Sequence, residues 1–241
     1  MMELGFVHAF YRFIVVNSYY FMVRVVSDFY LFFMRPYITS ERMVFRKWNV
    51  LFVLLILNLI LHSVHELINV IFDLVYIHKM EGLTDSFDDV YPVLILAVFI
   101  VPFLEEGMFR IYISKKNNFI SAFLFVLFGL LLSYDSPVMR LIYFGYIIFL
   151  LSLIIFRIRS KDNFKWMIYG SSFFFSFLHV SNYDLIGFKL FDYFIFSFEL
   201  VPNFIGGMIL AYIRVLFGFK FSVLSHGLWN LLVLLLSLMF T

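Results

Sequence analysis

The side chains of this sequence that are best suited to chemistry lie in three short polar motifs. The motifs are EExxxR at residues 105–110, FxxxH at residues 175–179 and HxxxN at residues 226–230, and each lies inside an otherwise apolar segment. Charged and amide groups are costly in a membrane, so within a membrane helix they mark a functional interior. A carboxylate, two imidazoles and an amide are the groups that activate a water molecule and stabilise the oxyanion formed by its attack.

The spacing within the motifs predicts which of these side chains share a helical face. Glu106 and Arg110 are four residues apart, a spacing at which a carboxylate and a guanidinium can pair. Glu105 is rotated by about 100° from Glu106, because a helix has about 3.6 residues per turn. One carboxylate can therefore be structural while the other works as a general base. His226 and Asn230 are also four residues apart, so they present an imidazole and an amide from one face.

The composition is that of a membrane protein. Of the 241 residues, 63% are hydrophobic and only 14% are charged, whereas a soluble domain carries about 25% charged residues. The sequence has no cysteine, which excludes disulfides, thiolate metal ligands and a cysteine nucleophile. A net charge of +2 gives no reason to expect a nucleic-acid partner.

The predicted fold is an all-α, polytopic helical membrane bundle. A membrane-spanning helix needs about 20 mainly apolar residues, and seven segments are candidates: 48–78, 91–113, 119–134, 138–156, 166–181, 194–213 and 221–240. They form one transmembrane domain over residues 48–241, with a core that contains the motifs over about residues 91–235. Residues 1–47 are expected to form an N-terminal region with an amphipathic helix in the membrane interface, because Arg12, Arg24 and Asp28 interrupt its apolar stretch. An eighth span is the alternative.

The distribution of Lys and Arg predicts the orientation of the chain, because cytoplasmic loops carry the excess of both. Basic residues concentrate before or at the start of the first span and around the second, fourth and sixth connections: Arg12, Arg24, Arg35, Arg42, Arg46, Lys47, Lys115, Lys116, Arg157, Arg159, Lys161, Lys165, Arg214 and Lys220. The alternate connections hold Lys79, Arg140 and Lys189. We therefore expect a protein of the cell membrane with a cytoplasmic N-terminus and an active site toward the cytoplasmic side.

The order of the three motifs, each in a hydrophobic segment, resembles the CPBP family of intramembrane proteases. This family includes the type II CAAX prenyl endopeptidases and bacterial Abi proteins linked to bacteriocin processing or self-immunity. The resemblance covers about residues 91–235 and implies a membrane-embedded endopeptidase that uses a glutamate-activated water. The roles that it implies are Glu105 as base, His179 as its partner, His226 and Asn230 as oxyanion donors, and Glu106 and Arg110 as supporting residues.

Cofactor, partners and function each keep an alternative open. No cofactor is certain, and a divalent metal such as zinc is the alternative to a glutamate-activated water, since Glu105, His179 and His226 are ligand types that suit zinc. The expected partners are membrane lipid and a peptide, membrane-anchored or lipidated protein substrate, and no feature of the sequence indicates the oligomeric state. The alternative function is that of a non-catalytic multipass membrane protein, a transporter or scaffold with a buried polar cluster.

Other polar residues in the predicted spans match no catalytic pattern. For His62, His65 and Glu66 we favour a structural role as interhelical hydrogen-bonding groups. Glu199 and Asn203 are four residues apart and could line the cavity that holds the three motifs.

Overall fold

The part of the chain that the structure describes is almost entirely helical. The structure is a computed structural model that describes residues 2–36, 47–71, 90–113, 118–133, 135–155, 161–182 and 190–240. The α-helices are α1 (Met2–Met34), α2 (Lys47–Ile71), α3 (Val90–Ile95), α4 (Val101–Arg110), α5 (Phe119–Leu132), α6 (Pro137–Ile155), α7 (Lys161–Leu178), α8 (Leu190–Phe217) and α9 (Phe219–Phe240). A π-helical turn, Leu96–Ile100, joins α3 to α4, and a 3-10 turn, His179–Asn182, follows α7. No strand occurs in these ranges, and the predicted all-α fold is confirmed.

Several of these helices are suited to cross a membrane. In the described part, four segments are long and apolar enough to do so: Lys47–Asn69, Pro137–Ile155, Phe196–Phe217 and Phe219–Leu236. The other three predicted spans are also helical, as α3 with α4, as α5 and as α7. The apolar helix α5 has 14 residues, about 21 Å at 1.5 Å per residue, so it is shorter than a hydrocarbon core of about 30 Å.

The second predicted span ends earlier than expected, because α4 stops at Arg110 and residues 111–113 form a turn. The side chain of Arg214 from α8 accounts for this end. Its Nε donates to the Arg110 carbonyl oxygen at 3.0 Å and its Nη2 to the Ile111 oxygen at 3.1 Å. A cation that binds the last carbonyl oxygens stabilises a helix C-terminus.

Some sequence predictions fall outside the described residues. These are residues 72–78 of the first predicted span, the last residue of the third and of the fourth, 134 and 156, and the basic residues Arg42, Arg46, Lys79, Lys115, Lys116, Arg157, Arg159 and Lys189.

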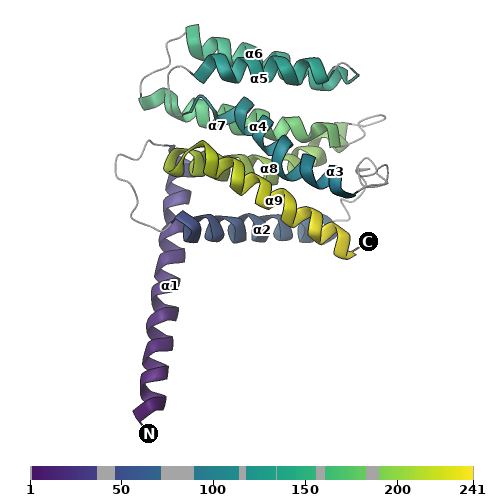
Figure 1. Cartoon of the computed structure of the whole chain (residues 1–241). Coiled ribbons are helices and arrows are strands. Elements are labelled where there is room, and N and C mark those ends of the chain that lie inside the picture. The colour runs from purple at the N-terminus through teal and green to yellow at the C-terminus, as the bar shows by residue number, and fades with distance from the viewer. Residues whose placement is uncertain are drawn as a thin grey trace.

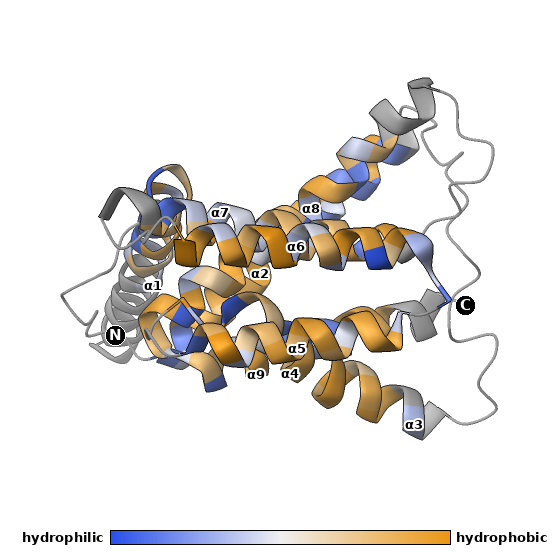
Figure 2. Ribbon diagram, turned by 90° about the horizontal axis from the view of Figure 1, so that it is seen from above, coloured by the Kyte–Doolittle hydropathy of each residue, from blue (hydrophilic) through white to orange (hydrophobic). Residues whose placement is uncertain are grey.

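The helices α2, α5, α6, α7, α8 and α9 run roughly along one common direction and form a bundle (Figure 1). α5 and α6 pair as a hairpin along one side of the bundle, and α2 lies along the opposite side. The outer helices are coloured mainly hydrophobic, as lipid-facing helices are (Figure 2). The ends of these helices therefore gather at two opposite ends of the bundle.

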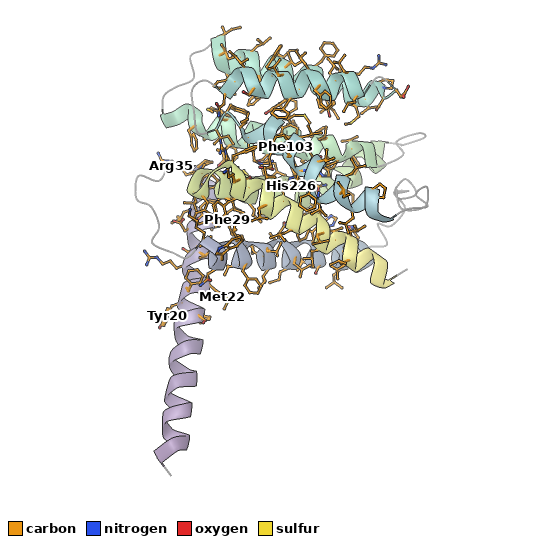
Figure 3. The ribbon with its side chains drawn as sticks, in the orientation of Figure 1. Tyr20, Met22, Phe29, Arg35, Phe103 and His226 are labelled. Carbon is orange, nitrogen blue, oxygen red and sulfur yellow. The ribbon has the colours of Figure 1, made fainter. Side chains whose placement is uncertain are left out.

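The helix α1 runs crosswise to α2, α5 and α6, at the end of the bundle where α2 begins (Figure 1). Its C-terminal half packs against the bundle through buried Val25, Phe29 and Phe32, and the hydroxyl of Tyr212 donates a hydrogen bond to Asp28. In the same half Tyr20 is 66% exposed and lies outside the bundle (Figure 3). The crosswise direction fits a helix in the membrane interface, and this location stays a prediction.

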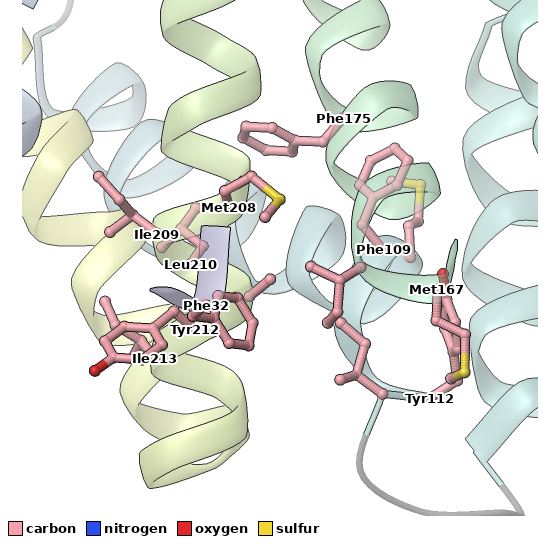
Figure 4. Close-up of a cluster of buried hydrophobic side chains, with 14 of the residues drawn as sticks. Phe32, Phe109, Tyr112, Met167, Phe175, Met208, Ile209, Leu210, Tyr212 and Ile213 are labelled. Carbon is pink, nitrogen blue, oxygen red and sulfur yellow. The ribbon is translucent and has the colours of Figure 1, made fainter. Parts of the chain in front are cut away.

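The hydrophobic core is centred on α8. Met208, Ala211, Tyr212 and Ile213 have no exposed surface, and the apolar side chains around them come from several helices (Figure 4). Close packing of this kind fixes the positions of the helices on which the polar motifs lie.

Candidate active site

The EExxxR motif forms a buried ion pair at the end of α4. The side chains of Glu106 and Arg110 have no exposed surface, and Arg110 donates directly to the Glu106 carboxylate, as the spacing predicts. Arg110 also donates to the carbonyl oxygen of Gly207 on α8 at 3.2 Å. Its guanidinium carbon lies 4.4 Å from the centre of the Phe175 ring, within the range of a cation–π contact. The pair thus ties α4 to α7 and α8.

Two residues of α9 complete the surroundings of Glu106. The hydroxyl of Ser222 donates to one carboxylate oxygen, and Nδ1 of His226 lies 3.2 Å from the other. Both carboxylate oxygens of Glu106 therefore have polar partners. A buried carboxylate needs such partners because burial removes it from water. The motifs did not indicate Ser222, although it lies four residues before His226 and so shares its helical face.

Glu105 meets a different environment. Its side chain is 13% exposed, and its Oε2 lies 3.5 Å from Nε2 of His226. That oxygen is buried and has no hydrogen-bond partner among the described residues. Because 3.5 Å is long for a hydrogen bond, Glu105 keeps an acceptor that a ligand in the adjoining cavity can use.

His179 follows the last residue of α7, and a residue of α7 holds its side chain. Its Nδ1 lies 2.9 Å from the carbonyl oxygen of Phe175, and the two rings are in edge contact with centres 4.9 Å apart. Nδ1 is therefore the donor and Nε2 the acceptor of a neutral ring. Phe175 also contacts His226, with ring centres 5.6 Å apart, so it positions both histidines.

Asn230 supplies a hydrogen bond that the backbone lacks at the π-helical turn between α3 and α4. The N–H of Val101 donates to Leu96 in the π-helical register, and Pro102 has no N–H. The carbonyl oxygen of Ala97 thus loses both backbone donors that would otherwise reach it, and Nδ2 of Asn230 donates to it at 2.8 Å. The second N–H of the Asn230 amide remains for another acceptor.

A cavity of about 350 Å³ lies between α4, α5, α6, α7 and α9. Glu105, His179, His226 and Asn230 line it together, so four of the six predicted site residues share one cavity. The other two, Glu106 and Arg110, lie behind Glu105 and support the site from the core. The rest of the lining is mainly apolar: Val101, Leu104, Met108, Phe128, Leu132, Met139 and Leu178, with Gly129 and Tyr143. No motif indicated Tyr143, because its position follows from the packing of α6 alone.

Comparison with known proteins assigns this site to a family. A family model described as type II CAAX prenyl endopeptidase Rce1-like matches residues 88–232. The chain belongs to this family. Comparisons with curated proteins and with solved structures gave no match. As a member of the Rce1-like family the chain is a membrane-embedded endopeptidase of the CAAX type, which confirms the resemblance seen in the three motifs.

The polar groups of this Rce1-like site do not fit a zinc ion. Zinc in a catalytic site takes at least three protein ligands, and in the described part no three His, Asp or Glu side chains come together closely enough to hold a metal. Glu105 and His226 approach within 3.5 Å. Glu106 is committed to Arg110 and Ser222.

Proposed function

We propose that this Rce1-like protein hydrolyses a peptide bond with a water molecule that Glu105 activates. The observation that carries the proposal is the contrast between the two neighbouring carboxylates. Glu106 is neutralised by Arg110 and fully hydrogen-bonded, whereas Oε2 of Glu105 has no described hydrogen-bond partner and its side chain lines the cavity. A general base needs such a free acceptor within reach of the proton that it removes.

The reaction proceeds by attack of water on the carbonyl carbon of the scissile bond. Glu105 takes one proton from the water as its oxygen attacks, and the carbonyl oxygen becomes an oxyanion. The proton then passes from Glu105 to the amide nitrogen, the carbon–nitrogen bond breaks, and a carboxylic acid and an amine leave. Nε2 of His179 is the free acceptor of its ring and orients the water beside Glu105.

Asn230 and His226 stabilise the oxyanion. Asn230 uses one amide N–H to hold Ala97 and offers the other to the cavity. His226 is held through Nδ1, 3.2 Å from Glu106, and its Nε2 is the nitrogen that can donate to the oxyanion in the cavity. Donors fixed before the reaction lower its barrier because they need no reorganisation when charge develops.

The apolar lining of the cavity supports a lipidated or membrane-anchored substrate. An apolar wall can hold an isoprenoid chain or an apolar peptide segment without burying an unpaired polar group against it. We therefore place a prenylated CAAX peptide first among candidate substrates. A bacteriocin-like peptide, with self-immunity as the biological outcome, is the second substrate class.

The proposed location is the cell membrane with the site toward the cytoplasm. α2 begins at Lys47, α7 at Lys161 and α9 at Phe219 beside Lys220, and these helix starts lie at one end of the bundle (Figure 1). An excess of basic residues at one end is typical of the cytoplasmic side.

The test compares Glu105→Gln with Glu106→Gln in purified protein, with a fluorogenic farnesylated CAAX peptide and its unmodified counterpart as substrates. Glu105→Gln should fold as the wild type and lower kcat by about a hundredfold or more, the usual effect of losing a general base. Glu106→Gln removes the counter-charge of Arg110, so it should lower the free energy of unfolding by about 3–5 kcal/mol. Wild-type kcat in Glu105→Gln would refute the assignment of the base.

A further inference from the structure

A second, smaller cavity lies on the other side of the active-site residues. Its volume is about 50 Å³, and α2, α7, α8 and α9 enclose it. His179, His226 and Asn230 line both this cavity and the large one. These three side chains therefore stand between two spaces, one beside Glu105 and the other beside α2.

The small cavity has polar side chains of its own. To the three shared residues it adds Asn58, His62, Asn203 and Ser225. A space of about 50 Å³ exceeds the roughly 10–15 Å³ that one water molecule needs on this measure. It is too small for a peptide or a lipid chain, so its size and its polarity both suit water.

An amide oxygen in the wall requires a donor that none of the described residues supplies. Asn58 is 7% exposed, and its Oδ1 has no hydrogen-bond partner among the described residues. Gly206 on α8 leaves space in front of this oxygen, because a Cβ there would lie 3.7 Å from Oδ1. Buried polar atoms of this kind are normally satisfied by an ordered water molecule.

The polar groups continue beyond the cavity along α2 and α8. Asn203 lies one helical turn from Glu199, which accepts a hydrogen bond from Asn69 at 2.8 Å. His65 joins the same cluster, with Nε2 3.9 Å from Glu199. This polar row extends from the small cavity toward the end of α2 at Ile71.

We propose that the small cavity is a water site that supplies the hydrolytic water, so that substrate and water reach Glu105 from opposite sides. The inference rests on the proposed function, because only a hydrolase consumes one water molecule per bond cleaved. The oxygen of that water enters the new carboxyl group, one of its protons reaches the leaving amine, and a further water from the cavity replaces it. The hydrocarbon of a membrane holds very little water. A polar cavity beside the active site therefore keeps water available for the next reaction.

The test replaces Asn58 by residues of similar size. Asn58→Leu fills the space without an acceptor, and kcat should fall about tenfold with KM unchanged, the effect of one lost hydrogen bond to water. Asn58→Asp keeps an oxygen acceptor and should retain most of the activity. Ser152→Ala is the control, since Ser152 lies on α6, lines neither cavity and binds a carbonyl oxygen of its own helix at 2.7 Å, and its kcat should stay at the wild-type value.

A second measurement separates the water site from the proposed function. A high-resolution experimental map should show ordered water within hydrogen-bond distance of Asn58 Oδ1 in the wild type and none there in Asn58→Leu. A wild type that cleaves no substrate, or an active Glu105→Gln variant, contradicts the proposed function, and the map still decides the water site. Unchanged kcat in Asn58→Leu, measured with an active wild type, overturns the supply role, and a dry map overturns the site.

Discussion

Glu105 and Glu106 are neighbours in the chain, yet their carboxylates meet opposite surroundings. Glu106 faces the core and satisfies Arg110, while Glu105 faces the cavity beside His226. The rotation of about 100° between adjacent helical residues is the cause. One residue anchors α4 against α9, and its neighbour remains available for chemistry. This division is why we expect their substitution by glutamine to affect stability in one case and kcat in the other.

Ser222 provides a residue-scale test of the support around Glu106. Ser222→Ala removes the hydroxyl that donates to the buried carboxylate, and hydrogen bonds to charged groups are worth about 1.5–3 kcal/mol. We expect the free energy of unfolding in detergent to fall by about 2 kcal/mol. Ser152→Ala is the control, because the Ser152 hydroxyl binds a carbonyl oxygen of its own helix at 2.7 Å. Equal stability of the two variants would contradict a structural role for Ser222.

At the scale of elements, the π-helical turn and α9 fit together through three residues. Pro102 removes a backbone donor, Asn230 replaces it at Ala97, and Gly227 allows α9 to approach the turn. A Cβ at Gly227 would lie 2.3 Å from the carbonyl oxygen of Val98, closer than any van der Waals contact permits. π-helical turns are frequent at functional sites. Here the turn directly precedes α4, the helix that carries Glu105.

Gly227→Ala tests this contact. Because the obstacle is backbone, α9 must move away from the turn, and such overpacking costs about 1–3 kcal/mol. The same movement displaces His226 and Asn230, so we expect a lower melting temperature together with a lower kcat. Gly145→Ala on α6 is the control, since its Cβ would meet only a phenylalanine ring, at 3.3 Å. A Gly227→Ala variant with wild-type melting temperature and kcat would show that the helices are not in close contact.

At the scale of the whole molecule, the bundle has two chemically distinct ends. The junction of α8 and α9 lies at the end where α2 begins and α1 crosses, and the turn between α5 and α6 lies at the opposite end (Figure 1). Lys220 is exposed at the first end and Asp135 at the second. Basic residues at the first end predict that it faces the cytoplasm.

Single cysteines can test this orientation, because the sequence contains no cysteine of its own. In intact cells, a membrane-impermeant maleimide should label Asp135→Cys, since this turn is expected outside the cell. Lys220→Cys should react only after the membrane is permeabilised. The reverse labelling pattern would place the N-terminal end outside and contradict the cytoplasmic site.

Much of the architecture was predictable from periodicity and composition. Apolar segments indicated the membrane helices, and the four-residue spacing of Glu106 and Arg110 indicated their ion pair, which the structure contains. Ser222 carried a local signal of the same kind, since it shares a face with His226. No signal in the sequence indicated the π-helical turn, because the turn shifts the helical register by one residue and leaves the apolar pattern almost unchanged.

The sequence by itself determined an all-helical membrane protein of the CAAX protease type and the six polar residues of its motifs, because these follow from residue types and from distances along single helices. Only the tertiary structure decided how those residues meet: that Glu105 approaches His226, that Asn230 holds Ala97, and that two cavities flank the histidines. The physical reason is that such contacts join residues far apart in the chain. Their geometry depends on how whole helices pack, which no local pattern encodes.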